Sequence, residues 1–172
     1  MIISIIVICL VGTLLHFLYE LTGHNKIVAL FAAVNESTWE HIKIALTPLL
    51  VWSLYDGYIF GVNPNYFIAK SISLLTIIIV IPLIFYTYTY FTKKAILPID
   101  IITFYVAITL AQMMFYYIIG LKPLGYNLEY VGVVLLFIIF GFYMIATIEP
   151  VENFLFKDPI SKKYGKEGHT EI

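Results

Sequence analysis

Two short groups of polar residues lie within an otherwise apolar chain, and their side chains are of the kinds that bind metals or transfer protons. The first group is His16 and Glu20, which are four residues apart, with His24 another four residues on. The second is the segment 35–41, Asn-Glu-Ser-Thr-Trp-Glu-His, in which Glu36 and Glu40 are again four apart. Residues at this spacing share one face of a helix, so each group presents its ionisable side chains together.

Imidazole and carboxylate groups are good ligands for zinc, manganese and iron. We therefore predict a divalent metal site with the ligands His16, Glu20, Glu36, Glu40 and His41. Asn35 and His24 are second-choice members of this site. An open coordination position lowers the pKa of a bound water to about 7 and so supplies a hydroxide nucleophile. With Glu36 and Glu40 as catalytic carboxylates, the protein would be an intramembrane hydrolase or transferase. Free amides at a nearby helix N-terminus would favour an anionic substrate group such as a lipid phosphate.

Two other interpretations of these residues remain open, so the sequence leaves undecided whether the protein is an enzyme. In the first, the same groups bind a proton, an ion or a small solute in a transporter, since broken helices such as that near residues 23–35 are typical of transport sites. In the second, they join helices in a structural or assembly subunit. Ser37 and Glu40 have the spacing of a capping box at a helix start, but capping leaves the histidines unexplained.

The composition identifies an integral membrane protein. The chain of 172 residues is 61% hydrophobic and 17% aromatic, with only 12% charged residues, and its mean hydropathy is +0.93. Soluble domains carry about 25% charged residues. All the basic residues are lysines, and without arginine the chain lacks the usual bidentate clamp for phosphate, so we exclude nucleic acid as a partner. Cys9 is the only cysteine, which excludes a disulfide or a thiolate metal site within one chain.

The apolar segments predict an all-α membrane bundle with five transmembrane helices. A spanning helix needs about 20 apolar residues, and the predicted spans are residues 2–21, 37–61, 67–90, 100–119 and 130–148. The apolar segment 27–34 is too short to cross, and we expect an interfacial or re-entrant piece there. Residues 1–150 form the bundle, and residues 151–172 form a polar cytoplasmic tail that we expect to fray towards its end.

The lysines predict the orientation of the bundle. One side of the membrane would hold Lys26, Lys43, Lys93, Lys94, Lys157, Lys162, Lys163 and Lys166. The other side would hold only Lys70 and Lys122. The positive-inside rule then places the N-terminus outside and the C-terminus in the cytoplasm, with segment 35–41 at the cytoplasmic boundary. Besides membrane lipids, a second copy of the chain or a larger membrane complex is an expected partner, because five helices make a small pathway.

Several other residues have simpler interpretations. Asp56 and Lys70 would lie on the outer side, as an ion pair or a solvated edge. Asp100 stands where a helix begins and is interpreted as its N-cap. Gly132 and Gly141 are expected at helix contacts, because small residues let membrane helices approach closely.

Three strings resemble an uncharacterised family. They are His-Phe-Leu-Tyr-Glu at 16–20, Asn-Glu-Ser-Thr-Trp-Glu-His at 35–41 and Phe-Lys-Asp-Pro-Ile-Ser-Lys-Lys-Tyr-Gly at 156–165. With these, nearly the whole chain resembles a family of small bacterial multi-pass membrane proteins, catalogued as a domain of unknown function. The resemblance implies a bacterial inner-membrane protein, and it implies no activity, substrate or catalytic residue.

Overall fold

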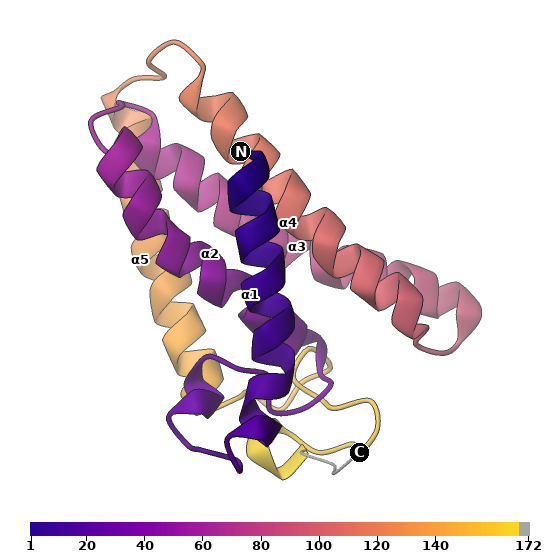
Figure 1. The fold of residues 1–172 in the computed structure, drawn as a ribbon. Helices are drawn as coiled ribbons and strands as arrows, with labels where there is room; N and C mark the ends of the chain where they lie inside the picture. The colour runs from indigo at the N-terminus through magenta and orange to yellow at the C-terminus, as the bar shows by residue number, and fades with distance from the viewer. Residues whose placement is uncertain (169–172) are drawn as a thin grey trace.

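The computed structural model describes residues 1–168, and within them the fold is entirely helical (Figure 1). The elements in chain order are α1 (Ile2–Leu21), η1 (Val28–Leu30), α2 (Thr38–Phe60), α3 (Tyr66–Thr92), α4 (Leu97–Ile119), α5 (Tyr126–Ile148) and η2 (Gly165–Gly168). No β-strand occurs in this part of the chain, where Lys157 and Tyr164 form an isolated bridge. The predicted all-α bundle of five long helices is confirmed.

Four of the five long helices, α1, α3, α4 and α5, are long and apolar enough to cross a membrane, with mean hydropathies of 2.5, 2.4, 1.7 and 2.6. The length and composition of these helices suit a multi-pass membrane protein. Helix α2 falls outside this set because it carries Glu40, Lys43 and Asp56. All three of these side chains are buried among the other helices.

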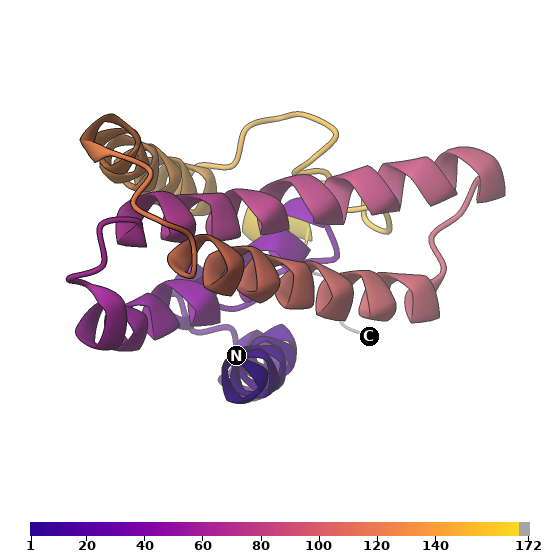
Figure 2. The same ribbon diagram turned by 90° about the horizontal axis from the view of Figure 1, so that it is seen from above.

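The helices are arranged around α2, α3 and α4, with α1 on one side of them and α5 on the other (Figure 2). Helix α3 packs along α4 and α5, while α1 packs mainly on α2 and α4. Helix α2 is buried along much of its length. This position explains how a helix with three charged residues fits into an apolar bundle.

The segment between α1 and α2, where the sequence predicts an interfacial or re-entrant piece, folds back against both helices. Helix α1 ends before Gly23 and His24, whose φ angles of 64° and 62° are both left-handed. The short turn η1 follows, and Ala29 and Ala33 beside it are buried. The backbone amide of Ala33 donates to the carbonyl of Leu15 on α1 over 3.3 Å.

Residues 151–168 are folded onto the end of the bundle where α1 ends and α2 begins (Figure 1). Phe156 and Asp158 in this segment are 2% and 0% exposed. The Trp39 amide donates to the Leu155 carbonyl over 2.9 Å, and the two rings of Trp39 and Phe156 have centroids 5.3 Å apart. The part of the predicted tail that the structure describes is thus packed against α2, and residues 169–172 lie outside the described residues.

The two glycines of α5 that were predicted at helix contacts differ from each other. A Cβ at Gly132 would overlap the backbone of Phe67 and Ile68 at the start of α3, which confirms Gly132 as a contact position. Among the described residues, no heavy atom lies within 4 Å of a Cβ built at Gly141, so the prediction for Gly141 is wrong.

These two positions provide a matched test of the packing between α3 and α5. We expect Gly132→Ala to lower the free energy of unfolding by about 1–3 kcal/mol, because the methyl group must displace backbone rather than a flexible side chain. Gly141→Ala should leave it unchanged or raise it by up to about 1 kcal/mol, since alanine is the better helix former. Denaturant titration of both purified variants in detergent measures the difference. Equal stability of the two variants would contradict this close approach of α5 to α3.

Candidate metal centre

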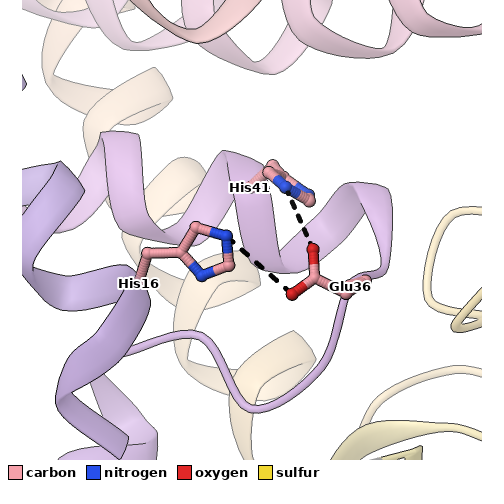
Figure 3. Close-up of side chains that lie close together, drawn as sticks. All are labelled: His16, Glu36 and His41. Atoms are coloured by element: carbon pink, nitrogen blue, oxygen red, sulfur yellow. Dashed lines mark ion pairs between the residues drawn. The ribbon is translucent and has the colours of Figure 1, made fainter. Parts of the chain in front are cut away.

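Three of the predicted ligands come together where α1 ends and α2 begins. His16 lies on α1, Glu36 precedes α2, and His41 lies in the first turn of α2 (Figure 3). The Nε2 atom of His16 is 3.8 Å from Oε1 of Glu36, and Nε2 of His41 is 3.7 Å from Oε2 of the same carboxylate. One potential ligand atom from each residue lies within 4.8 Å of the others. The side chains are 23–28% exposed, so the group is not enclosed on all sides.

A small set of hydrogen bonds fixes the turn that presents Glu36. The side chain of Asn35 accepts a hydrogen bond from the Ser37 amide over 2.8 Å. Its Nδ2 group donates to the carbonyl of Gly165, also over 2.8 Å, and so joins the turn to the C-terminal segment. Ser37 is the N-cap of α2 and accepts from the Glu40 amide. Asn35, a second-choice ligand, therefore orients the turn through its own hydrogen bonds.

The orientation of His41 determines which of its nitrogens can bind a metal. Its Nδ1 atom lies 3.0 Å from the carbonyl oxygen of Ser37. A carbonyl oxygen only accepts, so Nδ1 carries the hydrogen in this contact. In the neutral ring, Nε2 then has a free lone pair, and this lone pair faces Glu36. Backbone carbonyls hold metal-binding histidines in the same way in many proteins.

The separations in the cluster are close to those of a metal site that holds no ion. Zinc binds imidazole nitrogen at about 2.0–2.1 Å in tetrahedral geometry, which places neighbouring ligand atoms about 3.3 Å apart. The two nitrogen–oxygen distances, 3.8 Å and 3.7 Å, exceed this value slightly and end on different oxygens of Glu36. With one ligand atom taken from each residue, the three atoms lie within 4.8 Å of one another. Small side-chain rotations would therefore bring the three residues into contact with one ion. Two histidines and one glutamate are also the protein ligands of several catalytic zinc sites.

The family model described as "Family of unknown function (DUF6512)" matches residues 1–166. The chain belongs to this DUF6512 family. The predicted relationship to a family of unknown function is thereby confirmed. No curated protein and no solved structure matches the chain. Because the family description carries no activity, any function must be inferred from the residues of the site.

Glu40, predicted as a ligand and as a catalytic carboxylate, points away from the cluster in this DUF6512 protein. Its side chain is 6% exposed and forms an ion pair with Lys43, whose own side chain is 1% exposed. The same carboxylate accepts from the Val34 amide over 2.9 Å, and Lys43 donates to the Ala29 carbonyl over 3.0 Å. The capping box is therefore only half formed, since Glu40 binds Lys43 and Val34 instead of the Ser37 amide. A carboxylate already bound in this way is a structural group.

Glu20 and His24, the other two predicted members of the metal site, also lie outside the cluster. Glu20 is exposed in the last turn of α1 and does not share the grouping of His16, Glu36 and His41. His24 lies beyond the end of α1, and its ring is 5.1 Å from that of Tyr19. The helical face that would carry His16, Glu20 and His24 together ends because the chain turns at Gly23.

Asp100, which the sequence analysis interpreted as an N-cap, lies beside the cluster. The N-cap of α4 is Ile96, and Asp100 sits further into the first turn. Together with Glu36 and His41 it lines a small cavity of about 20 Å³, which is large enough for one water molecule. Its Oδ1 atom accepts a hydrogen bond from the hydroxyl of Tyr88 over 2.5 Å. Spacing along the chain gave no indication of this proximity, which depends on how α4 packs against α2.

Three amides around the start of α2 are already engaged. The Trp39 amide donates to Leu155, and the Glu40 amide donates to Ser37. The Ser37 amide is bound by Asn35. The expectation of a free helix N-terminus that attracts an anionic substrate is thus not supported, because the C-terminal segment and the capping side chains occupy these donors.

Glu36 and Glu40 therefore have different roles, which their variants can separate. Glu40→Gln should lower the free energy of unfolding by about 3–5 kcal/mol, because it leaves the buried Lys43 ammonium without its counter-charge. Glu36→Gln alters a partly exposed group and should change the free energy of unfolding by about 0.5 kcal/mol or less. Denaturant titration in detergent measures both. The double variant Glu40→Gln/Lys43→Met should recover part of the loss. A Glu36 variant as unstable as the Glu40 variant would show that we have misassigned the two carboxylates.

Proposed function

We propose that the chain binds one divalent metal ion through His16, Glu36 and His41. The arrangement of His41 and Glu36 is the observation that carries the proposal. A neutral Nε2 and a carboxylate oxygen both accept hydrogen bonds, so two such atoms facing each other need a cation or a proton between them. A metal ion satisfies both histidines and the glutamate at once, and the exposed side of the cluster leaves a coordination position open.

The ligand types favour zinc, with manganese or iron as further candidates. All three metals accept imidazole and carboxylate ligands. A thiolate ligand is not supplied, because Cys9, the sole cysteine of the sequence, lies on α1 outside the cluster. The three protein ligands and one open position correspond to a catalytic rather than a structural zinc site.

The chemistry that this site supports best is metal-assisted hydrolysis or group transfer at the membrane boundary. A bound metal would lower the pKa of a water molecule to about 7. The small cavity beside Glu36 and His41 can hold that water, and Asp100 lies against it as a proton acceptor. The Tyr88 hydroxyl holds the Asp100 carboxylate in place. Asp100 thus takes the catalytic role that the sequence analysis gave to Glu36 and Glu40. The substrate would reach the site from the bilayer, as an amphiphile with a carbonyl or phosphoryl group.

We also propose that α2 crosses the membrane, so that the bundle has five spans. Its 23 residues give a length of about 34 Å at 1.5 Å per residue, which exceeds the hydrocarbon thickness of about 30 Å. The charges on α2 are enclosed by other helices, whereas residues on its outer surface such as Val51, Leu54 and Ile59 are apolar. Together with the distribution of lysines, this supports a bacterial cytoplasmic membrane protein with its N-terminus outside and its C-terminus in the cytoplasm. Association with a second copy or a larger complex stays a prediction.

Metal analysis of the purified protein tests the site. Wild-type protein in detergent should bind close to one equivalent of Zn²⁺, measured by elemental analysis after dialysis. His16→Ala, His41→Ala and Glu36→Gln should each weaken binding by more than about 100-fold, beyond the effect of losing an outer-shell partner. Glu20→Gln is the matched control on the same helix as His16 and should bind like wild type. Asp100→Asn should retain the metal, because Asp100 lies outside the group of His16, Glu36 and His41.

Two results would overturn this proposal. A folded wild-type protein that binds no Zn²⁺, Mn²⁺ or Fe²⁺ would show that the cluster is an imidazolium–carboxylate ion pair. Binding that survives His41→Ala and Glu36→Gln would show that the metal is held elsewhere.

Cysteine labelling tests the orientation. In a Cys9→Ser background, Lys122→Cys and Lys163→Cys each place one thiol at an exposed position at opposite ends of the bundle. We expect a membrane-impermeant maleimide to label Lys122→Cys in intact spheroplasts, and to label Lys163→Cys only after permeabilisation. The reverse pattern would contradict the orientation, and labelling of both thiols from outside would contradict a crossing of the membrane by α5, which lies between them.

A further inference from the structure

The lysines of this protein differ in whether their charge is compensated. Lys70 on α3 is 1% exposed and is paired with Asp56 on α2, which is 0% exposed. The expected ion pair is thereby confirmed, and it is enclosed rather than a solvated edge. Lys157 and Lys162, which follow α5, are exposed and have no ion-pair partner within residues 1–168. Exposed lysines next to a membrane attract anionic lipids.

Lys157 and Lys162 line the same pocket, which we call the lysine pocket. It has a volume of about 320 Å³ and lies between the segment that follows α5 and two of the helices. Thr38 at the start of α2 forms part of its wall, as do Phe85 and Tyr86 on α3. The C-terminal segment therefore supplies the charges of this pocket, and α2 and α3 supply its uncharged walls.

The accessible charge of the lysine pocket is positive. The acidic residue that lines it, Asp158, is 0% exposed. Its carboxylate accepts hydrogen bonds from the amides of Ile160 and Ser161 and from the Ser161 hydroxyl. Lys162 donates to the carbonyl of Pro159 over 2.6 Å, and this neutral partner leaves the ammonium charge uncompensated. The pocket is therefore suited to an anion.

An apolar groove of about 670 Å³ adjoins the lysine pocket on the surface of α3. The two cavities share Tyr86 and Phe154. Further along the groove lie Leu83, Thr87 and Phe91, which are four residues apart and so lie along one face of the helix. Leu83 and Phe91 are 61% and 76% exposed. A cationic pocket and an open apolar surface thus lie side by side.

Tyr86 holds the junction of the two cavities in place. Its hydroxyl donates to the Phe154 carbonyl over 3.1 Å, and the two rings meet edge to face with centroids 5.2 Å apart. The Tyr86 oxygen also lies 3.1 Å from the hydroxyl of Thr38. A hydroxyl group has one hydrogen to donate, so Thr38 donates in this contact. The segment that follows α5 is thereby held against α3 (Figure 2), and the two lysines remain as donors for an anion.

We propose that the lysine pocket and the apolar groove together bind one anionic phospholipid. The phosphate accepts hydrogen bonds from Lys157 and Lys162, and one acyl chain lies in the groove against Leu83 and Phe91. Both volumes are typical of ligand sites, which occupy about 300–1,000 Å³. Basic pockets between membrane helices bind anionic headgroups in other proteins. A soluble anion would leave the groove unused, and an apolar helix of a second copy would leave the lysines without a partner.

The lysine pocket also lies next to the candidate metal centre. It shares Thr38 and Phe85 with the small cavity beside Glu36 and His41. Use of the bound lipid as a substrate of that centre would rest on the proposed function, whereas binding of the lipid does not. His41→Ala, which removes a proposed metal ligand, should therefore bind the phospholipid like wild type.

Native mass spectrometry of the full chain in detergent tests the site, with phosphatidylglycerol or phosphatidylcholine of identical acyl chains added. We expect wild type to bind one phosphatidylglycerol more tightly than phosphatidylcholine. Lys157→Gln/Lys162→Gln should weaken binding of phosphatidylglycerol by about 25-fold, since one lysine near an anionic lipid contributes about fivefold. Lys26→Gln/Lys94→Gln removes the same net charge from exposed positions outside both cavities and should bind like wild type.

Leu83→Trp tests the groove separately from the charges. The larger side chain occupies the groove and should weaken binding of phosphatidylglycerol, while the exposed position should allow normal folding. Leu14→Trp, at a 67% exposed position on α1, is the matched control and should bind like wild type.

Four results would overturn the lipid site. The first is equal binding of the two lipids by wild type. The second is an equal loss of binding in the control variant Lys26→Gln/Lys94→Gln, which would indicate general attraction by surface charge. The third is binding of glycerol phosphate as tight as that of the lipid, which would indicate a site for soluble anions. The fourth is a lipid-free dimer that Leu83→Trp dissociates, which would show that a second copy fills the groove. Wild type that prefers phosphatidylglycerol but binds no metal would support the lipid site and overturn the proposed function alone.

Discussion

Each charge buried within this bundle must find its partner inside the protein, because lipid supplies neither water nor counter-ions. Helix α2 carries most of these charges. Glu40 and Lys43 pair near its start, and Asp56 near its end pairs with Lys70 of α3. Both pairs need apolar helices around them, so α2 occupies a central position. The pairing of charges thus determines which helix the other four surround.

The candidate metal centre depends on the first of these pairs. Lys43 neutralises Glu40, and Glu40 in turn holds the Val34 amide. Asn35 ties the next residue of the same turn to the C-terminal segment. Glu36 is left as the acidic residue of the segment that can face His16 and His41. The polar residues of segment 35–41 therefore form two sets. One set holds the turn in place, and the other remains available for a ligand.

The sequence predicted the helices well, because long apolar segments and the residues that end them are local features. The contact of His16 with Glu36 and His41 was also predictable, since all three lie near the junction of two consecutive helices. Two kinds of information were missing. The directions of Glu20 and Glu40 depend on where α1 ends and on the partner that Glu40 finds in Lys43, and spacing alone gives neither. The position of Asp100 and the enclosure of Lys70 follow from packing between helices distant in sequence, and this packing leaves no local pattern.

An apolar layer between the metal cluster and the Asp56–Lys70 ion pair also has an electrical consequence. In a membrane, most of the transmembrane potential falls across the part of the protein with the lowest dielectric constant, which here is the layer around Leu49, Leu74 and Ile108. Moving one charge through the whole potential is worth about 2.3 kcal/mol per 100 mV. A cation at His41 would cross only a small part of that field. Occupancy of the cluster would therefore depend on the metal concentration of its own compartment and hardly on voltage.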